Sequence, residues 1–234
     1  VGGKLPMIYG FTWNLNKNED ALRHALDMLA QASGPWIAAF QETPNHAALL
    51  TELARRGLAD TCLAPGGRAA LAIVYSGLTQ TASFLRDEDD EYLAARFRAP
   101  TSSLDFICVC VHAKSKVDLA SDASVGGARA LLRHDISRIW DGGRLVLLGD
   151  FNSAPTDPEM VDWYCFYGLG PASERPGPQG PRRRRPHETL FSVPSALGAA
   201  QGTYKLSRYG ARAMVNCDFF MVDGATFKSA AAEV

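Results

Sequence analysis

Short apolar runs recur along the chain, and several of them end on polar side chains. Residues 145–148 are four consecutive apolar residues between Gly143 and Gly149, too few for a typical helix, which predicts a strand buried on both faces. Comparable strand-like runs cover residues 7–14, 36–42 and 105–112. These runs finish on side chains that can take part in chemistry: Asn14 and Asn16, Glu42, His112, and Asp150 and Asn152.

Helical periodicity appears between these strands. Asn18 is suited to the N-cap of a helix, because acidic residues and an apolar stripe at i, i+3, i+4 and i+7 follow it. Further helices are predicted at residues 46–56, 126–140 and 157–167. The helix at 126–140 is predicted from a roughly helical spacing of Ala130, Leu131, His134, Ile136 and Ile139.

The remaining segments are predicted to be strands and loops. Short runs at 69–75, 79–85, 92–97 and 104–112 are separated by turn-forming or charged residues, which predicts an antiparallel meander. Residues 117–125 are polar and small and predict a loop. Residues 214–222 predict a strand. Residues 170–186 contain five prolines and four consecutive arginines, which predicts a long surface loop.

Composition narrows the class of protein. The chain has 234 residues, 47% of them hydrophobic, enough for one sizeable core, and we expect a single domain over residues 1–234. The net charge of -1 gives no overall attraction to polyanions, so any phosphate binding is local. No apolar run approaches bilayer length, so stable membrane insertion is not expected. The five cysteines lack metal-site spacing, which favours reduced thiols and a cytoplasmic location.

Asp150 and Asn152 are the candidate catalytic pair. If the strand continues, its period of two places both on one side, where Asp accepts a proton from water and Asn orients it or holds an oxyanion. The alternative is an Asx-type turn after the strand. A thiol enzyme using Cys108 or Cys110 is disfavoured, because no base is recognisable beside either residue.

Five short motifs, in order, resemble those of the endonuclease/exonuclease/phosphatase superfamily, the DNase I-like proteins. The resemblance implies an α/β fold, a four-layer α/β/β/α sandwich in which helices cover both outer faces of two packed sheets. It covers most of the chain. The matching segments are Trp13-Asn14-Leu15-Asn16, Phe40-Gln41-Glu42, His112-Ala-Lys-Ser115, Gly149-Asp-Phe-Asn152 and Asn216-Cys-Asp-Phe-Phe220.

The same resemblance assigns roles to individual residues. Glu42 would be the principal ligand of a Mg²⁺ or Mn²⁺ cofactor, supported by Asn14. Asp150 would orient or deprotonate the attacking water, Asn152 would bind a phosphoryl oxygen, and His112 would contact the phosphate or assist the leaving group. Asp218 would orient a histidine from a later motif. The predicted substrate-binding residues are Asn16, Lys114, Arg182 and Arg183; the arginines have solvated charge as their alternative.

The chain departs from the superfamily pattern near its end. No Ser-Asp-His motif follows Asp218, and Asn216 stands where the superfamily has arginine. We expect the missing motif beyond Val234; the alternative is a degenerate member that binds phosphate or nucleic acid without cleaving it. The predicted function is divalent-metal-dependent hydrolysis of a phosphate ester, nucleic acid included, by direct attack of water. The motifs determine neither the substrate nor the oligomeric state.

Overall fold

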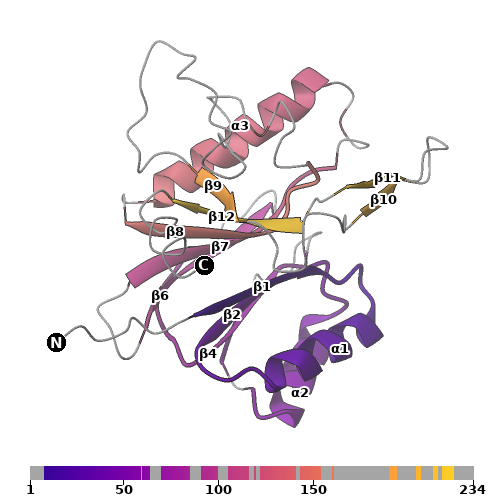
Figure 1. Ribbon diagram of the computed structural model, residues 1–234, viewed down its shortest axis with the longest axis vertical. Coiled ribbons are helices and arrows are strands. Elements are labelled where there is room, and N and C mark those ends of the chain that lie inside the picture. Colours follow the sequence, from indigo (N-terminus) through magenta and orange to yellow (C-terminus); the bar gives the residue numbers. More distant parts are fainter. Residues whose placement is uncertain are drawn as a thin grey trace. The chain divides into compact units, whose positions relative to one another are not determined.

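The computed structural model describes residues 8–58, 60–63, 70–84, 91–99, 105–115, 119, 122–140, 143–153, 160, 190–193, 204–206, 213–215 and 218–223. The chain falls into two compact units, Val1–His112 and Ala113–Val234 (Figure 1). None of the helices in these described ranges is long and apolar enough to cross a membrane. The assignment of residues 1–234 to a single domain stays a prediction.

The first unit begins with a β-α-β connection that brings two strand ends together. Strand β1 pairs in parallel with β2, and helix α1 joins them, as a parallel pair requires a crossover. The other neighbours in this sheet are antiparallel, in the order β1-β2-β4-β3. The strands are β1 (Tyr9–Asn14), β2 (Trp36–Gln41), β3 (Asp60–Leu63) and β4 (Ala72–Ser76).

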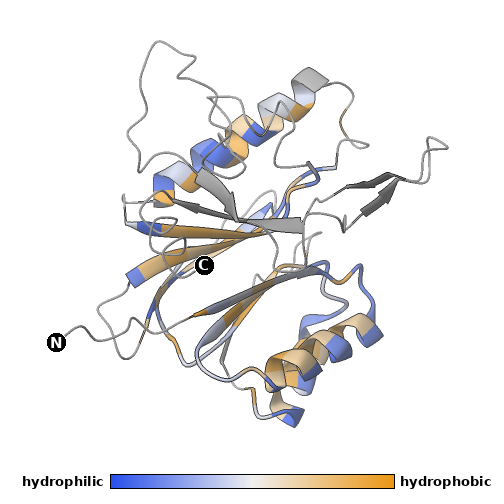
Figure 2. Cartoon of the chain, viewed as in Figure 1, coloured by the Kyte–Doolittle hydropathy of each residue, from blue (hydrophilic) through white to orange (hydrophobic). Residues whose placement is uncertain are grey.

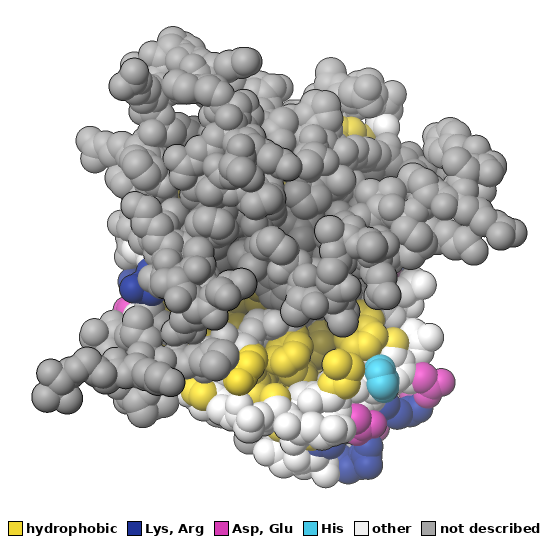
Figure 3. All heavy atoms as spheres, in the orientation of Figure 1, with side chains coloured by type: hydrophobic (Ala, Val, Ile, Leu, Met, Phe, Trp, Pro, Cys, Tyr) yellow, Lys and Arg dark blue, Asp and Glu magenta, His cyan; other side chains and the backbone are white. Residues whose placement is uncertain are grey.

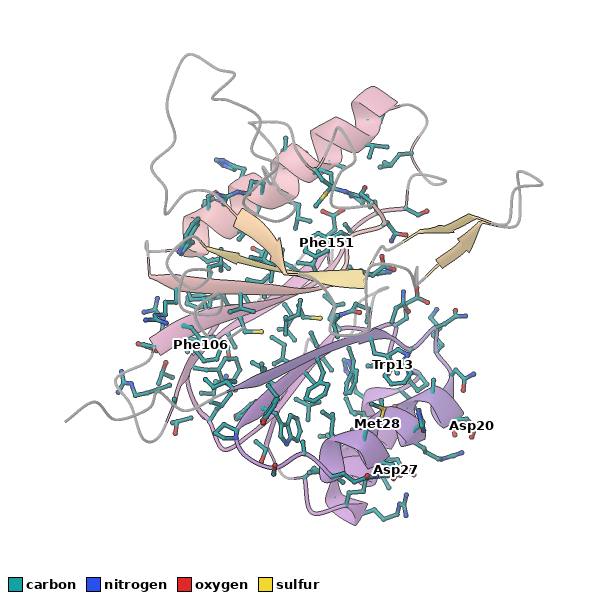
Figure 4. The ribbon with its side chains drawn as sticks, in the orientation of Figure 1. Trp13, Asp20, Asp27, Met28, Phe106 and Phe151 are labelled. Atoms are coloured by element: carbon teal, nitrogen blue, oxygen red, sulfur yellow. The ribbon has the colours of Figure 1, made fainter. Side chains whose placement is uncertain are left out.

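Helices α1 (Glu19–Ala30) and α2 (His46–Arg55) cover one face of this sheet, and their apolar sides face it (Figures 1 and 2). Leu26 of α1 packs in the same buried cluster as Trp36 and Phe40 of β2. Figure 4 shows Trp13 on the helical side of β1. The predicted N-cap of α1 is confirmed, because Asn18 Oδ1 accepts hydrogen bonds from two backbone N–H groups of the first turn, at 2.8 and 3.1 Å.

The second sheet of this unit contains β5 (Thr79–Phe84), β6 (Tyr92–Arg98) and β7 (Asp105–His112), paired antiparallel in that order. It faces the first sheet, since Gln41 Nε2 lies 3.3 Å from Cys110 Sγ. The predicted meander is wrong in one respect: the run at 69–75 belongs to β4 of the first sheet. The chain changes sheet at Gly77, whose φ of +67° is costly for other residues. Strand β3 was not predicted.

The outer surface of the first unit mixes charged and apolar side chains. Figure 3 shows hydrophobic side chains gathered on one described face, beside acidic and basic ones. Met28 and Leu50 are 47% and 46% exposed, respectively. Partly exposed apolar side chains such as these two are normal on protein surfaces and indicate no function by themselves.

The second unit is built on strand β8 (Arg144–Asp150), which is almost wholly buried, as predicted. Strand β12 (Asp218–Asp223) pairs antiparallel with β8 on one side and with β9 (Leu190–Val193) on the other. The segment predicted as a single strand at 214–222 is instead divided between β12 and β11 (Ala213–Val215), and β11 pairs with β10 (Tyr204–Leu206).

Helix α3 (Asp122–Ile139) begins inside the segment predicted to be a loop. The helix predicted at 126–140 is confirmed, and Ile136 is buried, but the predicted apolar spacing is wrong at Leu131, which is 66% exposed. The buried positions among the described residues of α3 are Val125, Gly126, Leu132 and Ile136, together with Arg129 and Arg133. Two arginines on the buried side conceal the helical period from an apolar pattern. The predicted helix at 157–167, apart from a buried helical Met160, and the predicted loop at 170–186 lie outside the described residues.

Candidate active site

A carboxylate with two nitrogen neighbours lies at the strand ends of the first unit. Asn14 is in register with Gln41, which places Asn14 beside Glu42, the residue that follows β2. Asn14 Nδ2 donates a hydrogen bond to Glu42 Oε1 at 3.2 Å. His112, at the end of β7, has its Nε2 atom 3.3 Å from the same oxygen. Asn14, Glu42 and His112 are called the Glu42 cluster below.

The Glu42 cluster leaves one carboxylate oxygen open. Both nitrogen contacts are made to Oε1, and among the described residues no hydrogen bond or ion pair is directed at Oε2. The Glu42 side chain is 25% exposed and that of His112 is 21% exposed, so solvent and small solutes reach them. A carboxylate oriented in this way, beside a carboxamide, fits a magnesium ion that keeps most of its water ligands.

A closed metal cage is a different arrangement. In the described ranges, no group of three or more His, Cys, Asp or Glu side chains is placed to hold a metal ion. The oxygen-bearing groups beside Glu42 are one carboxylate and one carboxamide, which is the donor chemistry of an open oxygen site rather than of a closed cage.

Main-chain hydrogen bonds fix the loops around Glu42. The backbone N–H groups of Leu15 and Lys17 donate to the carbonyls of Gln41 and Glu42, both at 2.8 Å, so the loop after β1 follows the loop after β2. Thr43 donates to the Ala70 carbonyl through its backbone N–H at 3.0 Å and its hydroxyl at 2.7 Å.

Backbone strain is concentrated at these strand ends. The non-glycine residues with positive φ in the described ranges lie directly after β1, β2 and β8 or, in one case, beside Thr43. Such conformations cost free energy and persist where surrounding hydrogen bonds impose them, often at functional sites. They are Asn16 (φ 48°), Lys17 (55°), Glu42 (49°), Ala70 (40°) and Asn152 (48°).

A second group of polar residues surrounds the end of β8 in the second unit. The Asp150 carbonyl accepts a hydrogen bond from the Ala113 N–H at 2.9 Å. Asn152 Nδ2 donates to the Ala113 carbonyl at 2.7 Å. Asp150 is 7% exposed and Phe151 is fully buried, on the α3 side of β8 in Figure 4. Ala113, Asp150 and Asn152 are called the Asp150 cluster.

Strand geometry stops at Asp150, so the expected period of two does not carry through to Asn152. The two residues are instead joined by an Asx turn, in which Asp150 Oδ1 accepts from the Asn152 N–H at 2.8 Å. Asn14 and Asn16 form the same turn after β1, at 2.9 Å. The turn interpretation is therefore correct, and it leaves the second N–H of the Asn152 carboxamide without an acceptor among the described residues.

The structure describes some of the other predicted site residues and not others. Asp218 pairs with Asp150 in the backbone register of β12 and β8. Asn16 and Lys114 are exposed. Cys108 and Cys110, which were disfavoured as catalytic thiols, are buried inside β7, as predicted. Arg182 and Arg183 lie outside the described residues. The catalytic, metal-binding and substrate-binding roles of all these residues stay predictions.

Two polar residues near these clusters were not predicted to matter. Gln41 is fully buried, and its Nε2 donates to Thr12 Oγ1 at 3.3 Å as well as to Cys110. Arg129 of α3 is fully buried and donates to the Lys114 carbonyl at 2.8 Å and to Ser153 Oγ at 3.3 Å. An arginine four positions after Val125, in phase with Leu132 and Ile136, was the available signal for Arg129.

Comparison with protein families shows to which family the chain belongs. The sequence profile of the endonuclease/exonuclease/phosphatase family matches residues 11–228. The chain belongs to this family. The comparison with curated proteins gives no match to this chain. Membership supports a phosphoesterase-type activity for this endonuclease/exonuclease/phosphatase protein.

Solved structures share the fold at low sequence identity. An endonuclease/exonuclease/phosphatase family protein of Bacteroides thetaiotaomicron has a TM-score of 0.60 at 9% identity, over 94% of this chain and 84% of that one. A mannosyl-6-phosphatase of the same organism has 0.59 at 9%, over 92% and 84%. The human Nocturnin catalytic domain has 0.56 at 14%, over 88% and 74%. The predicted DNase I-like α/β fold is confirmed.

Proposed function

We propose that this endonuclease/exonuclease/phosphatase protein is a divalent-metal-dependent hydrolase that cleaves a phosphate ester by direct attack of water. The observation that carries the proposal is the Glu42 carboxylate, whose Oε1 contacts Asn14 and His112 and whose Oε2 has no hydrogen-bond partner in the part of the chain that the structure describes. Buried structural carboxylates normally have their oxygens satisfied. A partly exposed carboxylate with an oriented open oxygen on a strained residue is suited to binding a cation.

In this proposal the Glu42 cluster holds the cation and meets the substrate. Glu42 and Asn14 would hold Mg²⁺ or Mn²⁺, which when bound acts as a Lewis acid on a phosphate oxygen. The His112 imidazole, within reach of Glu42, is oriented by that carboxylate and contacts the phosphate or the leaving oxygen. The hydrogen bond from Asn14 keeps the carboxylate from rotating away.

The Asp150 cluster would position the attacking water. Asp150 Oδ1 is engaged by the Asn152 N–H, and the charged carboxylate accepts a proton from water as the bond to phosphorus forms. One N–H of the Asn152 carboxamide holds the Ala113 carbonyl, so the other has a defined direction and can bind a phosphoryl oxygen. Asp218, in register with Asp150, is proposed to orient a further catalytic group.

The first test is turnover of bis-p-nitrophenyl phosphate and p-nitrophenyl phosphate with Mg²⁺ or Mn²⁺. We expect Glu42→Gln to abolish metal-dependent turnover, because the amide lacks the charge that binds the cation. Glu19→Gln is the control, since the Glu19 carboxylate on α1 is 61% exposed and pairs only with nearby Arg23 among the described residues. Full activity in Glu42→Gln, or equal loss in both variants, would reject the proposal.

The proposed substrate is a phosphate ester, and nucleic acid is one candidate class. Proteins with similar folds include ANGEL2, a 2',3'-cyclic phosphatase, and the mannosyl-6-phosphatase above. A panel of sugar phosphates, cyclic nucleotides and oligonucleotides would therefore rank substrates by kcat/KM. Binding of these compounds without turnover would support the alternative, a degenerate member acting as a phosphate- or nucleic-acid-binding module. Arg182 and Arg183 stay proposed substrate contacts.

A further inference from the structure

Arg129 on helix α3 is buried completely, which is unusual for a charged side chain. Removing a guanidinium from water is costly, so a protein retains one inside only where its hydrogen bonds are well placed. Arg129 Nη2 donates to the Lys114 carbonyl at 2.8 Å and to Ser153 Oγ at 3.3 Å. Ser153 is itself 1% exposed.

These contacts join the two segments that form the Asp150 cluster. Residues 113–115 and residues 150–153 are already linked by the hydrogen bond from Ala113 N–H to the Asp150 carbonyl and by that from Asn152 Nδ2 to the Ala113 carbonyl. Arg129 adds a third connection one residue farther along each segment, through Lys114 and Ser153. Its planar guanidinium presents donors in fixed directions, which suits it to set a spacing between two segments.

We propose that Arg129 is a positioning residue for hydrolysis, which acts by holding the Ala113–Ser115 and Asp150–Ser153 segments in catalytic register. The proposal rests on the phosphoesterase function proposed above. Arg129 itself does not touch the substrate. Small displacements of groups that orient a reactant lower the rate strongly, by about 100-fold for a shift near 1 Å.

Arg133 supplies a matched control on the same helix. It is also buried, at 5% exposure, and it donates to Ser137 Oγ at 2.7 Å. Its guanidinium lies 5.3 Å from the centre of the Trp140 ring. These described partners belong to the end of α3 rather than to the Asp150 cluster. Arg129→Met and Arg133→Met therefore remove the same charge and leave the same volume at two places on one helix.

The kinetic experiment compares both variants with wild type on bis-p-nitrophenyl phosphate. We expect Arg129→Met to lower kcat by about 10–100-fold with KM changed by less than about twofold, and Arg129→Lys to recover part of the loss. Arg133→Met should lower the melting temperature by about as much as Arg129→Met does, but it should leave kcat within about twofold of wild type. Equal kcat losses in the two methionine variants would overturn the proposal, since a merely structural role predicts that result.

Amide hydrogen exchange tests the same proposal without any turnover. The Ala113 N–H donates a hydrogen bond to the Asp150 carbonyl, and the Asn152 N–H donates one to Asp150 Oδ1. The exchange of these two N–H groups therefore reports the register of the two segments. We expect faster exchange at both in Arg129→Met and not in Arg133→Met. If Arg129→Met does not fold, Ser153→Ala is measured in its place. This variant keeps Arg129 and removes only its hydrogen bond to Ser153 Oγ, so we expect a small increase in the exchange of both N–H groups. Unchanged exchange overturns the inference, whereas an inactive wild type with the expected exchange rejects only the proposed function.

Discussion

Replacing Asp150 by asparagine separates the turn that it forms from the chemistry proposed for it. Asp150 Oδ1 accepts the Asn152 N–H at 2.8 Å, and the Oδ1 of an asparagine can accept the same bond. The carbonyl of residue 150, which accepts from Ala113 at 2.9 Å, belongs to the main chain and is unaffected. Asp150→Asn thus keeps the turn and removes the negative charge that accepts a proton.

The size of each effect follows from these contacts. Loss of a general base lowers rates by about 10²–10⁴-fold, or about 2.7–5.4 kcal/mol in activation free energy at about 1.36 kcal/mol per factor of ten. We expect this loss in kcat for Asp150→Asn, with the free energy of unfolding within about 1 kcal/mol of wild type. Asp150→Ala also strands the Asn152 N–H, which should cost about 1–3 kcal/mol of further stability.

Two measurements decide between the outcomes: kcat on bis-p-nitrophenyl phosphate with Mg²⁺ and unfolding in urea at the same pH. A wild-type kcat in Asp150→Asn would refute the catalytic role of Asp150. Equal unfolding free energies for Asp150→Asn and Asp150→Ala would refute the contribution assigned to the turn. The asparagine and alanine variants therefore control for each other.

Two further predictions concern stability. Gly127 lies inside α3 and a Cβ added there meets no atom within 4 Å, so Gly127→Ala should raise the free energy of unfolding in urea by about 0.5–1 kcal/mol; a decrease would contradict an open helical position. Arg56 donates to Asp27 Oδ1 at 2.8 Å and to Glu52, and these hydrogen bonds hold the pKa of both carboxyl groups below their ordinary values of 3.8 and 4.5. Because each pKa is lower in the folded state, this stabilisation is present above about pH 4.5 and is lost as the pH falls through the lowered values. Arg56→Gln should flatten that part of a stability–pH profile, and an unaltered profile would argue against the ion-pair network.

Local patterns predicted much of the secondary structure. The apolar run at 145–148, bounded by glycines, is part of β8, and the stripe after Asn18 is α1 with its expected cap. These predictions depend on residues close in sequence, whose period and capping chemistry are fixed by the backbone itself. The resemblance of five ordered motifs also predicted the fold, which is confirmed.

Errors arose where partners distant in sequence decide the outcome. The run at 69–75 has the composition of a meander strand, yet it joins β2 in the first sheet. Leu131 matched a helical spacing but is exposed, because α3 buries Arg129 and Arg133 instead. A hydrophobic pattern treats arginine as a surface residue and cannot register a guanidinium that is paired inside.

The sequence by itself determined which strand ends carry polar groups, since each end follows from a local run and its terminating residue. Only the tertiary structure decided that Asn14 and His112 both contact one oxygen of Glu42, whereas no described residue makes a hydrogen bond to the other oxygen. It also decided that the Asn152 side chain donates to the carbonyl of Ala113, which lies in a distant segment of the chain. These features depend on hydrogen bonds between segments far apart along the chain, and such bonds have no local pattern from which they can be inferred.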